Sequence, residues 1–335
     1  MSLSSSSRWL VGIAAMLALP AAIANERIQV VTSFSILADM AENIGGEHVA
    51  VTSLVGPDSD AHVYSPRPGD ARALAGADVV VFNGLLFEGW MERLIESSDY
   101  SGALVTATDG IDTLSYASHD HDHHDHSHGR DDDHGHGDDD PHAWQDMAQA
   151  RTYVANIRDG LIEADSANAN TYQANAERYL AEIVEVDAEI RALISEIPAS
   201  ASVITGHNSF GYFSNAYGVN FLSPVGLSTE ADPSGASMAA LVDVIEQENV
   251  QALFHENMTN QSIIVQLAEE TGLPIAGTLY ADALAREGEA STYLGMMRHN
   301  AKVLHDALGE PEHSDHDHDH DHDHDHDHDH SEHTH

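Results

Sequence analysis

The stretch TYQANAERYLAEIVEVDAEIRALI, residues 171–194, decides how the rest of the chain is arranged. Its apolar residues recur at steps of three and four, which predicts an amphipathic helix of about seven turns with one buried face. That face comprises Tyr172, Ala176, Tyr179, Ile183, Val186, Ile190 and Leu193. Pro198 marks the end of the helical pattern. Because a helix of this length is stiff, we expect it to join two separate lobes.

Short apolar segments alternate with segments of helical spacing on both sides of this helix. Strands are expected within residues 27–33, 48–55, 77–84 and 102–108 before it, and within 201–207, 220–226, 250–256 and 273–281 after it. Apolar strands that alternate with helices favour parallel sheets covered on both faces. The sequence therefore predicts an α/β fold of two Rossmann-like lobes with parallel sheets, bridged by one long rigid helix.

The first 24 residues have the composition of a secretory signal peptide. Arg8 supplies a basic start, Trp9 to Leu19 form an apolar core, and Ala22 to Ala24 form a small-x-small cleavage sequence. The predicted parts of the mature chain are an N-terminal lobe over 25–165, a connecting helix over 166–198, a C-terminal lobe over 199–309 and a tail over 310–335.

Charge and cysteine content restrict the partners and the compartment. The chain has 335 residues, no cysteine and a formal net charge of −43 at pH 7. Such a chain repels nucleic acid and anionic membrane surfaces, and it attracts cations. Without cysteine it has neither a disulfide framework nor an attachment point for lipid. We therefore expect a periplasmic monomer that is exported by its signal peptide, carries no lipid anchor and binds no nucleic acid.

Two runs of the chain, 118–139 and 310–335, consist mostly of His and Asp. We expect both to be disordered, because they have almost no apolar surface to bury. Neutral imidazoles bind Zn²⁺, but every chelate in a floppy chain has an ordering cost. The runs are therefore expected to bind several ions weakly. In the first run the candidate residues are His119, His121, His123, His124, His126, His128, His134 and His136.

Four side chains outside the two His/Asp runs are stronger candidates for a metal site. His62, His207 and Asp282 follow predicted strands, and His142 follows the first His/Asp run. In open α/β sheets ligands bind beyond the carboxyl ends of the strands, so these residues could converge on the cleft between the lobes. Three imidazoles with one carboxylate or water form the four-coordinate site that Zn²⁺ prefers. Spacing alone leaves the site open, because the chain has other histidines.

Four motifs, in this order, resemble the metal-binding receptors of ABC importers for zinc and manganese, specifically the high-affinity zinc receptor. They are GPDSDAHVYSPRPGDARALAGADVVVFNGLLFEGWMERL, DPHAWQD, TGHNSFGYF and GTLYADAL, with a His-rich insertion just before the second. The resemblance implies two α/β lobes joined by a long rigid helix. It also implies that His62, His142 and His207 bind the metal. Asp282 matches an aspartate of many members, although water could take its place.

Position 207 bears on the choice of metal. Manganese-type members of this family have a carboxylate there, so the nitrogen of His207 favours Zn²⁺ over the harder Mn²⁺. The usual proline before the first histidine is Ala61 in this chain. Glu256 follows a predicted strand and could either contact a ligand-loop histidine from outside the metal site or serve the fold alone.

The resemblance implies a receptor and not an enzyme. It would capture one tightly bound Zn²⁺ in the periplasm and deliver it to a membrane permease driven by a cytoplasmic ATPase. An alternative is periplasmic buffering or storage of zinc through the His/Asp runs. A zinc hydrolase would keep water on a metal with three protein ligands, but the sequence contains neither H-E-x-x-H nor G-x-S-x-G.

Overall fold

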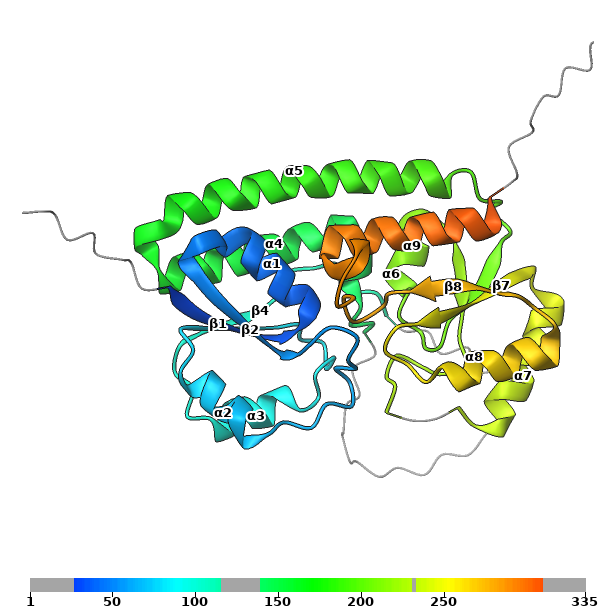
Figure 1. Ribbon diagram of the computed structural model, residues 1–335, viewed down its shortest axis with the longest axis horizontal. Helices are drawn as coiled ribbons and strands as arrows, with labels where there is room; N and C mark the ends of the chain where they lie inside the picture. Colours follow the sequence, from blue (N-terminus) through cyan, green and yellow to red (C-terminus); the bar gives the residue numbers. More distant parts are fainter. Residues whose placement is uncertain (1–26, 116–138, 231–232, 310–335) are drawn as a thin grey trace, which may run out of the picture.

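The computed structural model describes residues 27–115, 139–230 and 233–309. Figure 1 shows two lobes side by side beneath a long helix. Among the described residues, no helix is both long and apolar enough to cross a membrane. The predicted signal peptide, nearly all of the first His/Asp run and the tail lie outside the described residues, and so do the eight candidate histidines of that run.

The first lobe is built on a parallel sheet of four strands in the order β2-β1-β3-β4. These strands are β1 (Ile28–Phe34), β2 (Val49–Val55), β3 (Val79–Phe82) and β4 (Ala103–Thr106). Its helices are α1 (Ser35–Gly45), α2 (Pro68–Ala75), α3 (Met91–Ser97) and α4 (Met147–Ala164). Helices α1 and α4 cover one face of the sheet and α2 and α3 lie on the other (Figure 1), which explains why β3 is apolar on both sides.

The second lobe repeats this plan, with a parallel sheet in the order β6-β5-β7-β8. Its strands are β5 (Ser202–Ile204), β6 (Asn220–Leu222), β7 (Val250–Glu256) and β8 (Ile275–Leu279). Its helices are α6 (Gly211–Tyr217), α7 (Gly235–Gln247), α8 (Gln261–Thr271) and α9 (Tyr293–Leu308). The two parallel sheets confirm the predicted fold class.

Helix α5 (Ala169–Ile194) runs along the top of both lobes (Figure 1). It buries the predicted face from Tyr172 to Ile190, but Leu193 is only half-buried and Ile194 points inward instead. The reason is the helical period of 3.6 residues, which makes a four-residue step from Ile190 the better continuation of the stripe. The 3₁₀ turn Ser166–Asn168 separates α5 from α4.

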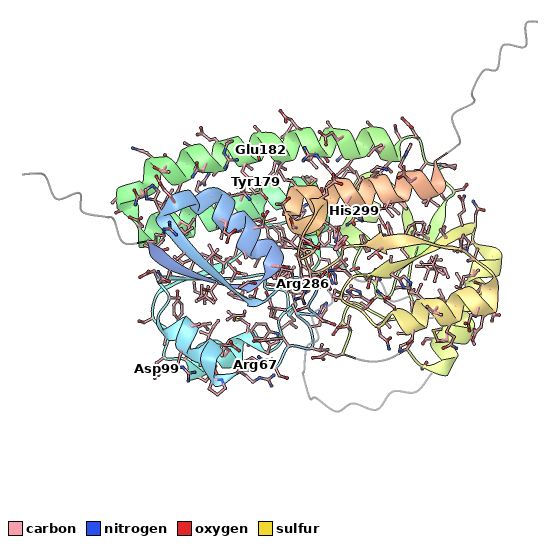
Figure 2. All side chains as sticks on the ribbon, in the orientation of Figure 1. Arg67, Asp99, Tyr179, Glu182, Arg286 and His299 are labelled. Carbon is pink, nitrogen blue, oxygen red and sulfur yellow. The ribbon has the colours of Figure 1, made fainter. Side chains whose placement is uncertain are left out.

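Asp39 joins the long helix to both lobes. From α1 its Oδ2 accepts a hydrogen bond from the Tyr179 hydroxyl on α5 at 3.3 Å and from the backbone N–H of Tyr293 at 3.0 Å, where α9 begins. Figure 2 shows Tyr179 on the side of α5 that faces α1. One apolar core runs from the first lobe through α5 and α9 into the second, so the two lobes pack on a common core.

Candidate metal centre

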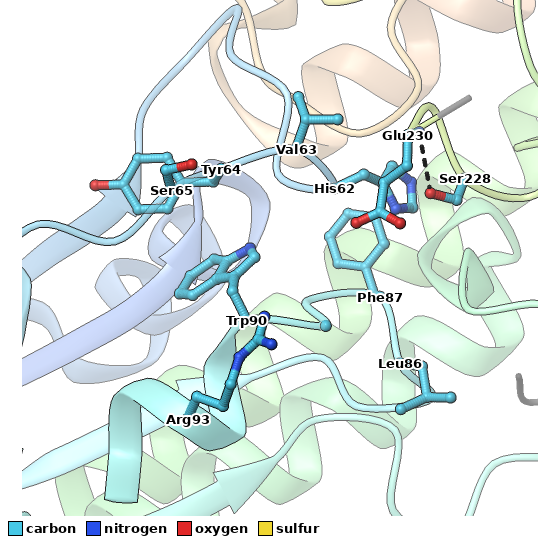
Figure 3. A pocket seen from close by; sticks show the side chains of 11 residues that line it. His62, Val63, Tyr64, Ser65, Leu86, Phe87, Trp90, Arg93, Ser228 and Glu230 are labelled. Carbon is cyan, nitrogen blue, oxygen red and sulfur yellow. Dashed lines mark hydrogen bonds between the residues drawn. The ribbon is translucent and has the colours of Figure 1, made fainter. Parts of the chain in front are cut away.

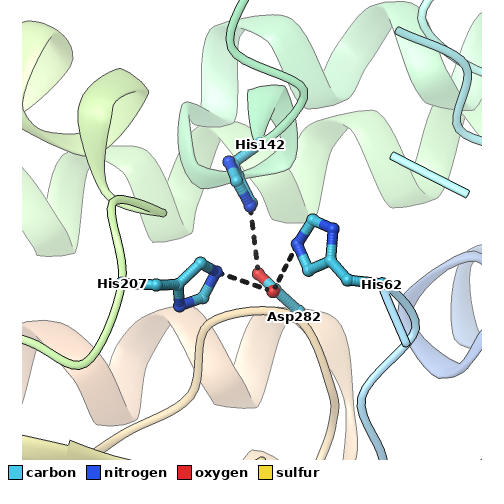
Figure 4. Close-up of side chains that lie close together, drawn as sticks. All are labelled: His62, His142, His207 and Asp282. Carbon is cyan, nitrogen blue, oxygen red and sulfur yellow. Dashed lines mark ion pairs between the residues drawn. The ribbon is translucent and has the colours of Figure 1, made fainter. Parts of the chain in front are cut away.

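The four side chains singled out in the sequence meet where the lobes face each other. His62 lies in the loop after β2, and His142 directly precedes the 3₁₀ turn Ala143–Gln145. His207 follows β5 and Asp282 follows β8. Because parallel strands end at the same edge of their sheet, loops far apart in sequence come together there, and Figure 4 shows the three imidazoles around the carboxylate.

The Nε2 atoms of the three histidines face the Asp282 carboxylate. The distance is 3.3 Å from His62 to Oδ2, 3.0 Å from His207 to Oδ2 and 3.6 Å from His142 to Oδ1. One ligand atom from each of the four residues lies within 4.8 Å of the others. His62 is 6% exposed, and the other three residues are fully buried.

Within the described part of the chain, these atoms have no other partner. The three Nε2 atoms and both oxygens of Asp282 are buried without a hydrogen bond of acceptable geometry, although buried polar atoms are normally paired. A cation would satisfy the nitrogen lone pairs and the carboxylate together. Metal–ligand bonds of about 2.0–2.1 Å in a tetrahedron place the ligand atoms about 3.3–3.4 Å apart. The observed separations from Asp282 bracket that value, so the residues fit a divalent cation.

Two further carboxylates hold the outer nitrogens of the rings. Asp140 Oδ1 lies 2.7 Å from Nδ1 of His142 and also accepts the backbone N–H of His142 at 2.9 Å. Glu256 Oε2 lies 2.8 Å from Nδ1 of His207. A proton kept on Nδ1 leaves the lone pair of Nε2 free for a metal and fixes the direction of the ring.

Sequence reasoning considered Glu256 but did not consider Asp140. The signal for Asp140 was present, because Asp60-Ala61-His62 and Asp140-Pro141-His142 repeat the same Asp-x-His spacing. It also did not predict α6, which directly follows the His207 loop. Gly211 at the start of α6 is needed for close approach, since a Cβ there would lie 2.3 Å from Asp140 Oδ2.

Without a metal, the site holds an internal ion pair. Burial opposes charge on the His207 imidazole, but the carboxylates of Glu256 and Asp282 outweigh it and hold the pKa of His207 well above its usual value. Burial likewise opposes charge on Asp282, yet His207 and His142 hold the pKa of Asp282 well below its usual value. At His62 burial prevails and lowers the pKa. A metal that bound at Nε2 would therefore have to displace a proton from His207.

Neighbouring side chains tie the ligand loops together. Trp144 Nε1 and Gln145 Nε2 both donate to the carbonyl of Ala281 at 2.9 Å, which joins the His142 loop to the Asp282 loop. Trp90 Nε1 donates to the carbonyl of Ala61 at 2.7 Å and fixes the residue before His62.

Comparisons with known proteins agree with this architecture. The family model described as "Zinc-uptake complex component A periplasmic" matches residues 30–307. The manganese-binding lipoprotein MntA of Halalkalibacterium halodurans is 34% identical over 288 residues, which cover 85% of this chain and 90% of that protein. The iron-binding protein YfeA of Yersinia pestis is 30% identical over 290 residues, covering 85% and 88% respectively.

A solved structure shares the whole fold. The periplasmic zinc binding protein TroA from Treponema pallidum superposes with a TM-score of 0.76 at 26% identity, covering 85% of this chain and all of that chain. The names of these three proteins give three different metals. MntA is named a lipoprotein, so the comparisons lend no support to the expectation that this chain lacks a lipid anchor.

Proposed function

The chain belongs to the family of periplasmic component A proteins of zinc-uptake complexes, and on that premise we propose that it captures Zn²⁺ and delivers it to a membrane permease. As a member it is an extracytoplasmic, non-enzymatic metal-binding receptor of an ABC importer. Beyond family membership, we propose which metal binds and which residues bind it. The proposed partner is a permease with its cytoplasmic ATPase.

The observation that carries this proposal is the set of unpaired buried atoms between the lobes. Three imidazole nitrogens and one carboxylate face a single point, and no other group among the residues that the structure describes satisfies them. We assign His62, His142, His207 and Asp282 as the ligands. A site with three nitrogen donors suits Zn²⁺, whereas Mn²⁺ prefers carboxylate, carbonyl and water oxygens. The carboxylate reduces the net charge of the filled site from +2 to +1.

The His/Asp runs have an auxiliary part in this proposal. They supply several weak zinc sites on the same chain and raise the local concentration of zinc near the tight site. If buffering through the runs were instead the whole function, zinc uptake by cells would survive loss of the ligands between the lobes. Uptake in cells that carry His62→Ala with His142→Ala therefore separates a receptor from a buffer, and intact uptake would favour the buffer.

Titration of the full chain with Zn²⁺, Mn²⁺ and Fe²⁺ in competition with a chelator tests the site and the metal together. We expect one tight Zn²⁺ per chain, weaker Mn²⁺ and Fe²⁺, and a loss of about 100-fold or more in zinc affinity for His142→Ala, since that change removes a ligand outright. The matched control is His119→Ala, which leaves the tight site unchanged. Tighter binding of Mn²⁺ than of Zn²⁺ would contradict the choice of metal.

A further inference from the structure

Asp60 lies two residues before His62 and makes a contact that Asp140 and Glu256, the carboxylates beside the other two histidines, do not make. Asp140 and Glu256 each direct their carboxylate to the ring of their own histidine. Asp60 accepts the backbone N–H of His62 on Oδ1 at 2.8 Å, but its other oxygen, Oδ2, accepts a hydrogen bond from Thr229 Oγ1 at 2.6 Å. Thr229 follows β6 and belongs to the second lobe, so this carboxylate spans the two lobes.

The segment that carries Thr229 is itself attached to a ligand loop. The backbone N–H of Asn208 donates to the carbonyl of Gly226 at 3.0 Å, directly after His207. The Asp60 carboxylate therefore connects the loop of His62 in the first lobe, through Thr229, to the loop of His207 in the second. The two residues of the contact are 169 positions apart in the chain.

The same segment borders the most open side of the metal centre. A cavity of about 820 Å³ is lined by His62, Leu86 and Trp90 from the first lobe and by Ser228 and Glu230 from the second. Figure 3 shows Ser228 and Glu230 beside the imidazole of His62. His62 is also the most exposed of the four assigned ligands.

We infer that Asp60 is a positioning residue that slows the release of the metal through its bond to Thr229, without touching the metal itself. The bond holds the segment 228–230 across the His62 side of the centre and keeps the His62 loop against the second lobe. Breaking it frees that segment and the ligand with the most solvent contact, so the metal leaves faster while all four ligands stay in place. This inference rests on the proposed function.

The experiment measures the rate at which excess chelator removes Zn²⁺ from the full chain loaded with one equivalent. Thr229→Val keeps the shape of the side chain and removes the hydroxyl. We expect release of Zn²⁺ to be about tenfold faster, which corresponds to about 1.4 kcal/mol and lies near the lower end of what one hydrogen bond to a charged group contributes. Thr229→Ser retains the hydroxyl and restores the slow rate. Thr271→Val at the end of α8 is the matched control, because it removes a threonine hydroxyl of the second lobe that donates to the carbonyl of Leu267, and it leaves the rate unchanged.

Two outcomes overturn the inference. One is a release rate for Thr229→Val equal to that of the unaltered protein. The other is release from Thr271→Val that is as fast as release from Thr229→Val, which would show that general loosening of the second lobe speeds release. Failure of the proposed function looks different, because the unaltered protein would then hold no tight zinc at all.

Discussion

Glu256 and Asp282 hold the imidazole of His207 from opposite sides. Glu256 Oε2 lies 2.8 Å from Nδ1, and Asp282 Oδ2 lies 3.0 Å from Nε2 of the same ring. All three side chains are buried. When His207 binds a metal as proposed, we expect the charge of Glu256 to act on it through the ring, because it makes the imidazole a more basic ligand and fixes its direction.

Glu256→Gln tests this action directly. Glutamine keeps the size of the side chain and its oxygen can still accept a hydrogen bond from the Nδ1–H group, but it removes the charge. We expect the affinity for Zn²⁺ to fall about 10- to 100-fold. Glu269→Gln on the exposed face of α8 is the control, with unchanged affinity expected in the same chelator competition. Equal affinities for both variants would show that Glu256 serves the fold alone.

Asp282→Asn distinguishes a carboxylate ligand from water. The change removes the negative charge of a fully buried group that faces three imidazoles. Because loss of one partner of a buried ion pair costs about 3–5 kcal/mol, we expect zinc affinity to fall at least 100-fold. The exposed Asp109→Asn is the control. Unaltered affinity, measured by titration calorimetry, would mean that Asp282 is not a ligand and that water completes the coordination.

The same variant changes the protonation of His207 in the metal-free protein. Asp282 is one of the two carboxylates that raise the pKa of His207, and burial opposes them. Burial lowers the pKa of His207, and the charge of Asp282 helps to raise it. Without that charge, the pKa of His207 falls in metal-free Asp282→Asn. NMR titration of the imidazole resonances measures this change. An unmoved titration of His207 would show that Glu256 alone holds the proton.

Much of the fold follows from local patterns in the sequence. The apolar patterns that predict the buried strands and the inner face of α5 extend over only a few residues each. Most of the same apolar residues are buried in the structure. Helix α6 was not predicted because its sequence, GYFSNAY, contains Gly, Ser, Asn and aromatic residues, most of which have low helix propensity. The inward side chain at the end of α5 is Ile194 instead of Leu193, because the sequence allows steps of either three or four there.

The site is predictable only in part, for a related reason. His62, His207 and Asp282 each follow a parallel strand, and the topology alone then places them at one edge. The bond of Asp60 to Thr229 depends on how two lobes pack, and nothing in the local sequence reports it. The choice among zinc, manganese and iron depends on differences in coordination free energy, which residue types indicate but do not measure.

The long helix should contribute to stability through its inner face. Ile183 is 1% exposed on that face, whereas the neighbouring Val184 is 54% exposed on the other. Ile183→Ala leaves a cavity in the core shared by both lobes, so we expect the free energy of unfolding to fall by about 2–5 kcal/mol. Val184→Ala should change it by less than about 0.5 kcal/mol. Denaturant unfolding of the metal-free protein measures both, and similar midpoints would show that the helix does not support the core.

Glu88 should make the metal-free protein less stable as the pH rises. Its buried carboxylate accepts hydrogen bonds from Ser33 Oγ and from the backbone N–H groups of Asn83 and Gly84, yet burial raises its pKa from 4.5 to about 7. Between these values the folded chain holds a proton that the unfolded chain has lost. Stability therefore falls as the pH rises through this window, by about 3 kcal/mol once the pH is above 7.

Glu88→Gln removes this titration while keeping the oxygen that accepts the Ser33 and Asn83 hydrogen bonds. Its amide nitrogen meets only the Gly84 N–H group, whose contact at 3.3 Å is the longest of the three. At pH 5 the two proteins should differ little, since Glu88 is then mostly protonated in the fold. At pH 8 the variant should have gained about 2–3 kcal/mol relative to the unaltered protein. Denaturant unfolding with chelator present measures the difference, and parallel pH profiles would show that Glu88 does not hold a proton in the folded state.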